Sequence, residues 1–353
     1  MIIDEQDEKA PLKKMIFGLD ETIEKIKTAI SDFESGQRIN VAIIALPYAG
    51  KSELVDEIVK MHSHDVTKIT FSSIISNKEE IPLLEDNNRI MIFDNCHYLY
   101  MRKIGGFDVL EEFLEMVISS DDRLFITTWN IHSWNYLNRV MDIGRYFPVR
   151  ITLPQMDHEN MKRFLLSEYA EDEIQFINDK EVKDEKIFRI VKRPIAERFT
   201  HSRINLYSLK INYIALQTML FNKKPEETAE SIIFKEIVKL SRGNPGVAKE
   251  IWDKWLEHPV IKTSNIDTID TDIDLDSTGR FVLYLILSMG HIKKEELKNI
   301  LNWSCNVDDM IINKILFEMQ NQDVIVKKAE YYSVKPERLY VVVRYLENIR
   351  LVW

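Results

Sequence analysis

Residues 39–54 read INVAIIALPYAGKSEL, and the rest of the chain is organised around this stretch. Residues 41–45 are continuously apolar, which predicts a buried strand. A short loop rich in Pro, Ala and Gly follows, and the pattern of residues 53–61 predicts a helix. A strand, a tight loop that ends in Gly-Lys-Ser and a helix form the layout of a phosphate-binding P-loop.

Each residue type in this loop has a chemical reason. A helix N-terminus offers free N–H groups and a partial positive charge to an anion. Gly50 lets the backbone approach phosphates, Lys51 would reach the β- and γ-phosphates, and the Ser52 hydroxyl would bind Mg²⁺. The candidate nucleotide-binding residues of the stretch are Ala45, Pro47, Tyr48, Ala49, Gly50, Lys51, Ser52 and Glu53. Ala45 stands where the pattern has Gly, and it costs free energy if that position needs a positive φ. The alternative is a strand-to-helix turn with a chance Gly-Lys-Ser.

Composition limits the class of protein. A chain of 353 residues has room for two or three domains, and 45% hydrophobic residues support real cores. The net charge of −10 and a pI near 5.5 argue against a surface covered by basic patches, but leave a local nucleic-acid surface open. Cys96 and Cys305 lack metal-ligand spacing, which indicates reduced thiols in a cytoplasmic protein. The N-terminus lacks the form of a signal peptide, and no window approaches 18 uninterrupted apolar residues, so we predict no membrane span.

A second buried strand, residues 89–95 (RIMIFDN), ends in Asp94. A carboxylate at the carboxyl end of such a strand lies beside the P-loop and is suited to hold Mg²⁺ through water. Ser52 and Asp94 are therefore the predicted metal site. The alternative is an Asp that caps a turn at the end of the strand.

Other segments complete a predicted parallel sheet with helices. The predicted strands are residues 66–74, 123–130 and 149–153, and the predicted helices are residues 17–33, 107–118 and 134–142. The strand 123–130 ends in the polar sequence TTWN, whose last residue is Asn130. That amide is a further candidate for the site.

The second half of the chain is mostly helical in pattern. The predicted helices there are residues 157–169, 172–178, 206–221, 226–240 and 248–256. Residues 265–276, rich in Asp, Ile and Thr, are predicted to be a linker. Beyond it, helices over residues 278–289, 293–301 and 307–321 and strands over residues 324–328 and 340–344 indicate a winged helix-turn-helix.

The charges of this last region leave its partner open. Residues 274–353 contain eleven acidic and eleven Lys or Arg side chains. Asp308 and Asp309 begin the third helix, where they would face phosphates if that helix entered a DNA groove. DNA contact remains one possibility, and protein contact or autoinhibition is the other.

Taken together, these residues resemble the P-loop ATPases of the AAA+/STAND group and are similar to archaeal-type Orc/Cdc6-like proteins. The order Lys51-Ser52, Asp94, Asn130 and residues 242–245 (RGNP) carries the resemblance, which covers roughly residues 15–350. It implies an α/β fold with a five-stranded parallel sheet of order 5-1-4-3-2, a helical lid and a C-terminal winged helix. The implied organisation is an acidic tail (1–14), a P-loop core (15–155), a helical lid (156–264), a linker (265–276) and the winged helix domain (277–353).

The resemblance also implies roles for residues outside the P-loop. Gly18, before an acidic pair and a helix, would lie over the adenine. Asn130 would act as the sensor that contacts the γ-phosphate or the attacking water. Arg145 would reach into a neighbouring subunit's site, so an oligomer is possible. Three residues at the start of a lid helix would face the nucleotide, namely Arg242, Asn244 and Pro245.

Asn95 is the main departure from the pattern that the resemblance implies. Most ATPases of this branch have Glu at that position, which polarises the attacking water. An amide orients water but does not take its proton at neutral pH. Asp94, Asn95 and Asn130 are thus the predicted catalytic residues of a slow ATPase that binds ATP and Mg²⁺ and works as a nucleotide-dependent switch. The alternative is a DNA-binding regulator whose P-loop domain is a scaffold or a non-hydrolysing nucleotide sensor.

Overall fold

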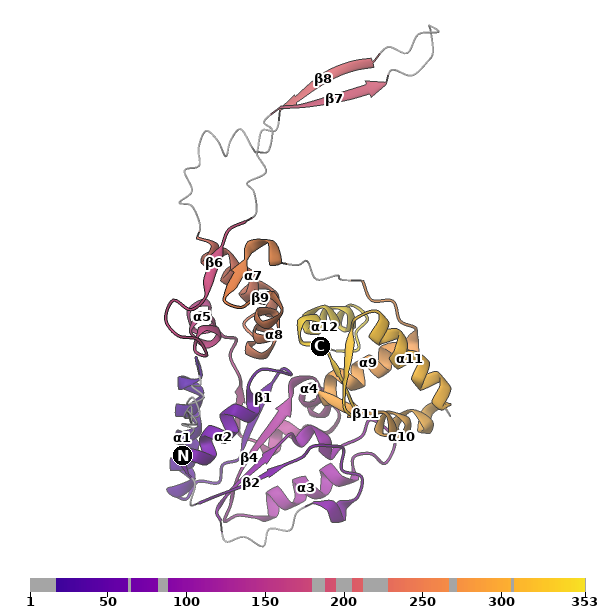
Figure 1. The fold of residues 1–353 in the computed structure, drawn as a ribbon. Helices are drawn as coiled ribbons and strands as arrows, with labels where there is room; N and C mark the ends of the chain where they lie inside the picture. Colours follow the sequence, from indigo (N-terminus) through magenta and orange to yellow (C-terminus); the bar gives the residue numbers. More distant parts are fainter. Residues whose placement is uncertain are drawn as a thin grey trace, which may run out of the picture. The chain divides into compact units, whose positions relative to one another are not determined.

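The computed structural model describes residues 17–62, 65–81, 88–179, 188–194, 205–211, 228–266, 272–305 and 308–352 (Figure 1). The predicted acidic tail lies outside these ranges. The chain divides into two compact units. The first unit consists of Met1–Ala170, Ile237–Lys254 and Thr268–Trp353, and the second consists of Glu171–Glu236 and Trp255–Asp267. The domain limits expected from the sequence remain predictions.

A five-stranded parallel sheet forms the centre of the first unit. Its strands are β1 (Val41–Ala45), β2 (Val66–Thr70), β3 (Ile90–Asp94), β4 (Leu124–Asn130) and β5 (Val149–Thr152). They lie in the order β2-β3-β4-β1-β5, and every neighbouring pair is parallel. The predicted order 5-1-4-3-2 is confirmed. Because the carboxyl ends of parallel strands share one edge, the residues that follow β1, β3 and β4 meet there.

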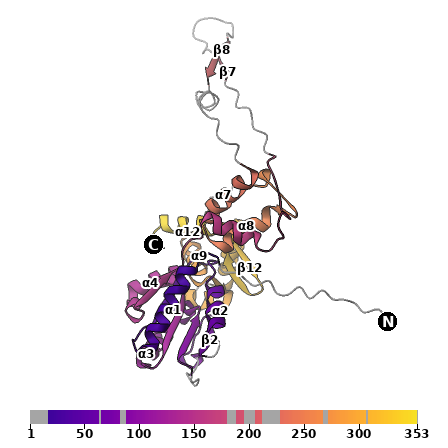
Figure 2. The ribbon, with the colours of Figure 1, turned by 90° about the vertical axis from the view of Figure 1, so that its left-hand side faces the viewer.

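Helices cover both faces of this sheet. They are α1 (Asp20–Glu34), α2 (Lys51–Met61), α3 (Asp108–Ser119) and α4 (Ile131–Met141). Helices α1 and α2 lie next to each other (Figures 1 and 2). Their side chains, among them Ile30 and Leu54, pack in one cluster with Val41 and Ile43 of β1. On the other face, Phe113 of α3 meets the β3 ring of Phe93 edge-on at 5.0 Å. Burial on both faces explains why β1 and β3 read as continuous apolar runs.

Residues 277–352, which we call the C-terminal domain, also belong to the first unit. Its elements are α9 (Ser277–Met289), β11 (His291–Lys293), α10 (Lys294–Cys305), α11 (Asp309–Asn321), β12 (Ile325–Lys328), β13 (Tyr331–Val334) and α12 (Leu339–Asn348). The three strands form an antiparallel sheet of order β11-β13-β12. The winged-helix assignment remains a prediction.

One strand predicted in this domain is wrong. Residues 340–344 lie inside α12, and the strand that pairs with β12 is β13. The β-branched run Val341-Val342-Val343 suggested a strand, but buried residues recur at Leu339, Val342, Val343 and Leu346. That spacing is helical, so the amphipathic pattern decides against local β-propensity.

Between the sheet and the C-terminal domain in sequence, the described residues form three helices and a group of short strands. The helices are α5 (His158–Leu166), α7 (Ala229–Ser241) and α8 (Pro245–Trp255). Strands β6 (Gln175–Ile177), β9 (Leu256–Glu257) and β10 (Val260–Lys262) form one sheet of the second unit, and β7 (Phe188–Pro194) pairs with β8 (Asn205–Ile211) in another. Short 3₁₀ turns are η1 (Lys78–Glu80), η2 (Cys96–Leu99), η3 (Ile143–Tyr146), η4 (Thr263–Asn265) and η5 (Pro336–Arg338).

Two helices predicted in this region are wrong. Residues 172–178 contain β6, which pairs in parallel with β10. Residues 206–211 belong to β8, and the rest of the predicted helix 206–221 lies outside the described residues. In both cases the strand forms with a partner elsewhere in the chain, which local periodicity does not reveal.

Within the described ranges, no helix has both the length and the apolar character needed to cross a membrane.

Candidate functional site

The predicted phosphate loop connects β1 to α2 at the carboxyl edge of the sheet. Gly50, immediately before α2, has φ 87°, a left-handed conformation in which a side chain costs free energy. Tyr48 is also left-handed, with φ 66°. Ala45 is the last residue of β1 and pairs with Asn130 in the parallel register. Its φ is not positive, so the departure from Gly at this position carries no such cost.

Lys51 is the first residue of α2, and its ammonium lies in the loop. Its Nζ donates to the backbone oxygen of Leu46 at 3.4 Å, which is a long hydrogen bond. Burial lowers the pKa of Lys51 to about 8, against the opposing effect of the negative charges of Asp94 and Glu53. Because removal from water disfavours the charged form, an anion in the loop would stabilise this ammonium.

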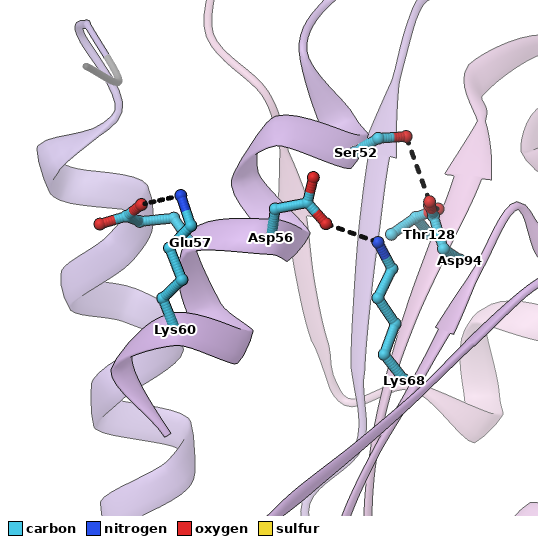
Figure 3. A network of polar contacts seen from close by, with 7 residues as sticks. All are labelled: Ser52, Asp56, Glu57, Lys60, Lys68, Asp94 and Thr128. Atoms are coloured by element: carbon cyan, nitrogen blue, oxygen red, sulfur yellow. Dashed lines mark hydrogen bonds and ion pairs between the residues drawn. The ribbon is translucent and has the colours of Figure 1, made fainter. Parts of the chain in front are cut away.

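The predicted metal-binding side chains Ser52 and Asp94 are in contact (Figure 3). The Ser52 Oγ donates to Asp94 Oδ2 at 3.1 Å, and the Thr128 Oγ1 donates to Asp94 Oδ1 at 2.5 Å. Asp94 is only 1% exposed, and its carboxylate is held by one hydroxyl from β4 and one from α2. These hydroxyl and carboxylate oxygens suit Mg²⁺, which protein sites hold through one or two carboxylates together with phosphates.

Thr128 was not among the residues predicted for the site. It lies two positions before Asn130 in β4, and therefore on the same face of the strand. The alternation of side chains along β4 could have identified Thr128, because it places Thr128 and Asn130 on the same face of the strand. Its hydroxyl also accepts a hydrogen bond from the Asn95 N–H at 2.8 Å, so Thr128 fixes both residues at the end of β3.

Asn95 has a structural reason to be asparagine. It adopts a left-handed conformation with φ 65°, which Asn tolerates better than most residues. Its Nδ2 donates to the backbone oxygen of Phe71 at 3.2 Å, in the segment that follows β2. The amide is thus engaged with the protein, and its part in hydrolysis remains a prediction.

Asn130 is likewise engaged, at the start of α4. Its Oδ1 accepts from the His132 N–H at 3.0 Å, which caps the helix. Its Nδ2 donates to the backbone oxygen of Leu287 in α9 at 2.8 Å. The residue is 1% exposed. The predicted sensor is therefore covered by the C-terminal domain in this structure.

Asn244 and Gly246 contact the phosphate loop. The Asn244 Nδ2 donates to the backbone oxygen of Pro47 at 2.9 Å, and the Gly246 N–H donates to that of Tyr48 at 3.0 Å. Gly246 was not predicted as a site residue, yet a Cβ there would lie 2.7 Å from Tyr48 Cβ. Pro245 is the first residue of α8.

Arg242 is exposed, and its guanidinium lies over the Tyr340 ring, 4.8 Å from the centroid. It contacts α12 of the C-terminal domain through this ring. A phosphate-facing role for Arg242 remains a prediction.

The structure places Gly18 and Arg145 elsewhere. Gly18, with φ 70°, lies beside α5, where an added Cβ would be 3.4 Å from Asn160 Nδ2. Arg145 is exposed in η3 and stacks on the Tyr146 ring at 4.7 Å. It precedes β5 and so lies toward the amino end of the strands, opposite the phosphate loop. Its action on a neighbouring subunit, like the adenine contact of Gly18, remains a prediction.

A parallel sheet of order 5-1-4-3-2, with a Gly-Lys-Ser loop after β1 and an acidic residue at the end of β3, is the arrangement of a P-loop NTPase fold. No known protein family and no curated protein matches the sequence.

Several solved structures resemble the chain over nearly its whole length. The RuvB Holliday junction branch migration motor of Thermotoga maritima is 11% identical with a TM-score of 0.42, covering 95% of both chains. Cdc6p from Pyrobaculum aerophilum is 11% identical with a TM-score of 0.43, covering 97% of both chains. A Walker-type ATPase of Pyrococcus abyssi is 12% identical with a TM-score of 0.40, covering 94% of this chain and 97% of that one. Because these scores are below 0.5, the fold assignment depends on this chain's own sheet and loop.

Proposed function

We propose that the chain binds Mg·ATP in the phosphate loop and works as a nucleotide-dependent switch that hydrolyses ATP slowly. The observation that carries this proposal is the meeting of Lys51, Ser52 and Asp94 at the carboxyl edge of the sheet. An ammonium with one long hydrogen bond, beside a hydroxyl and a carboxylate, has the chemistry to hold a phosphate and its cation.

These residues would contact different parts of Mg·ATP. Lys51 supplies positive charge to the phosphates, and the N–H groups at the start of α2 add the partial charge of a helix N-terminus. Ser52 and Asp94 would hold Mg²⁺, which when bound neutralises phosphate charge. Thr128 keeps the Asp94 carboxylate oriented through its 2.5 Å hydrogen bond.

Slow hydrolysis follows from the residue after Asp94. General-base assistance is typically worth about 10²–10⁴-fold in rate, and the Asn95 amide does not accept a proton at neutral pH. Its Nδ2 is bound to Phe71 instead. A protein that binds ATP well and hydrolyses it slowly spends most of its cycle in the ATP state, which suits a switch.

The test is a titration with Mg·ATP, with phosphate release measured alongside. Lys51→Ala should weaken ATP binding by about 10- to 100-fold, because it removes hydrogen bonds to a charged group. Lys60→Ala is the matched control, since Lys60 lies on the same helix and pairs with Glu57 in solvent. No binding heat and no thermal shift for the wild type at millimolar Mg·ATP would show that the proposal is wrong.

A second candidate function, DNA binding by the C-terminal domain, is favoured by a group of lysines. Lys293, Lys294 and Lys327 line a cavity of about 440 Å³ between the start of α10 and the β12–β13 hairpin, together with Glu295 and Glu330. Nearby acids offset part of this charge, since Lys294 and Lys298 pair with Asp309. Retention of a short duplex that falls steeply with salt, and falls further in Lys327→Ala, would support this candidate. If the protein does not retain the duplex even at low salt, DNA binding by the C-terminal domain is excluded.

A further inference from the structure

Helix α11 has three large apolar side chains on its solvent side. Met310 is 74% exposed, Phe317 is 62% exposed and Ile311 is 48% exposed. The other strongly exposed large apolar side chains of the described residues belong to separate segments of the chain, namely Met61, Ile104, Ile118, Val140 and Ile177. Isolated exposed apolar residues are ordinary, whereas a group of them indicates an interaction site. The group on α11 is therefore a candidate for a contact with another molecule.

Helical spacing places these side chains along one side of α11. Residues three or four positions apart lie on the same face of a helix. Met310, Lys314 and Phe317 have this spacing, and Ile311 and Glu318 lie beside them. The buried residues of the helix lie on its other side and are Ile312, Ile315, Leu316 and Met319. We call Met310, Ile311, Lys314, Phe317 and Glu318 the α11 stripe.

The charges of the α11 stripe favour a partner of the same kind. The Lys314 Nζ lies 3.7 Å from Glu318 Oε1, and the two side chains are 75% and 47% exposed. An ion pair in solvent contributes little to stability, so its members can exchange partners at low cost. The stripe has no net charge and follows Asp308 and Asp309, so it offers little attraction to nucleic acid. A second copy of α11 presents one base and one acid at the matching spacing.

The stripe also complements itself in space. A contact between identical surfaces has a two-fold axis, and two α11 helices that cross such an axis run antiparallel. With the axis at the level of Ile315, Lys314 of one copy lies within one helical turn, about 5.4 Å along the helix, of Glu318 of the other copy. Met310 of one copy then lies within one turn of Phe317 of the other. Each contact occurs twice, so one arrangement pairs the charges and covers the apolar side chains.

We propose that the α11 stripe is a docking surface for a second copy of this chain, and that two C-terminal domains pair through antiparallel α11 helices. The pairing does not require nucleotide. Stable interfaces bury about 800 Å² on each partner, and one side of a 13-residue helix offers less. The pair is therefore weak and reversible, with a dissociation constant in the micromolar range. An α11 helix held in this pair is not free to enter a DNA groove.

The first experiment is sedimentation equilibrium of the full chain over a range of micromolar concentrations. Phe317→Ser should weaken the association by about 10-fold or more, because a large aromatic side chain at the centre of an interface contributes strongly to affinity. Ile104→Ser is the matched control. Ile104 is 70% exposed in the loop before α3 and is not part of the stripe, so its removal should leave the association unchanged.

The second experiment exchanges charges and identifies the partner as a second copy. Lys314→Glu leaves two acids on the stripe, and Glu318→Lys leaves two bases. Each variant alone should associate about 3- to 10-fold more weakly than the wild type, because like charges then meet at both contacts. An equimolar mixture of the two variants should associate at least as tightly as the wild type. Recovery in the mixture also shows that neither substitution had unfolded the protein.

Three results would overturn the proposal. The first is a wild type that stays monomeric at the highest concentration at which it remains soluble. The second is self-association that is equal in Phe317→Ser and Ile104→Ser, or a mixture of the two charge variants that associates no more tightly than either alone. The third is a Phe317→Ser protein that self-associates like the wild type but no longer retains a short DNA duplex, which would assign the stripe to nucleic acid.

Discussion

Two groups of side chains line the same edge of the sheet and differ in what holds them. Lys51 and Ser52, at the start of α2, are partly or largely exposed, and their hydrogen bonds within the protein are long. Asn95 and Asn130, at the ends of β3 and β4, have amides that donate to backbone oxygens of Phe71 and Leu287. The first group is arranged to bind an anion, whereas the second is occupied by the protein itself.

This difference separates binding from turnover. A loop with an exposed hydroxyl and a poorly solvated ammonium gains from a phosphate without breaking strong contacts. An amide that must first leave a buried hydrogen bond adds a free-energy cost to every step in which it takes part. We therefore expect substitutions in the first group to change affinity, and substitutions in the second group to change the rate of turnover.

The largest effect should come from Asn95→Glu, which tests whether the second group limits turnover. A carboxylate at this position supplies the missing base, and turnover should rise by about 10²-fold, the low end of the range for general-base assistance. A carboxylate does not donate to the backbone oxygen of Phe71 as the Asn95 amide does. The Glu side chain should therefore point away from Phe71. ATP affinity should stay nearly unchanged. The measurement is steady-state phosphate release.

Asn95→Gln is the matched control, since it keeps the amide and changes only the length of the side chain. Both variants lose the left-handed preference of Asn, so their thermal stability should fall to a similar degree. A wild type that already turns over as fast as ordinary AAA+ enzymes, or an Asn95→Glu protein no faster than Asn95→Gln, would show that another residue supplies the base.

A smaller effect is expected for Asp94→Ala, which tests the carboxylate that Ser52 of the first group contacts. The substitution removes the acceptor of both Ser52 and Thr128, and with it the carboxylate for Mg²⁺. The part of ATP affinity that depends on Mg²⁺ should fall by about 10-fold, as expected for the loss of a charged hydrogen-bonding group. Asp56→Ala is the control, because Asp56 is exposed on α2 and pairs with Lys68 (Figure 3). Equal Mg²⁺ dependence in the two variants would exclude Asp94 as a metal ligand.

The sequence predicted the first group better than the second, and the reason is physical. The phosphate loop is a local feature, in which the φ of Gly50 and the start of α2 follow from adjacent residues. The sheet order was implied by the resemblance, and the apolar run of residues 41–45 predicted the limits of β1. The Asn95 and Asn130 amides donate to the backbone oxygens of Phe71 and Leu287. These acceptors are distant in sequence, so no local pattern predicts the contacts.

The same reasoning explains the wrong secondary-structure predictions. Strand β6 forms because β10 pairs with it, and the β-branched run in α12 is helical because its buried positions face the domain core. Thr128 was missed because the prediction chose Asn130, the last polar residue of β4, and Thr128 is the residue that contacts Asp94. The alternation of side chains along β4 contained that information.

An effect of about the same size is expected from pH, and it tests whether Lys51 binds as an ammonium. Its pKa is lowered to about 8 from the usual value for lysine, chiefly by burial. The charged form is therefore lost as the pH rises through about 8, and ATP affinity should fall in the same direction. If only the ammonium binds, the affinity should drop roughly 10-fold between about pH 7 and pH 9.

Lys51→Arg is the sharpest comparison for this profile. A guanidinium stays charged throughout this range, so the variant should bind more weakly at pH 7, because its fork does not match the lysine site, but with a flatter pH dependence. Lys60→Ala, which leaves the loop unchanged, should keep the wild-type slope. The measurement is a series of Mg·ATP titrations at constant ionic strength and free Mg²⁺. A flat wild-type profile, or one as steep in Lys51→Arg as in the wild type, would mean that the pH dependence of binding does not come from the ammonium in the loop.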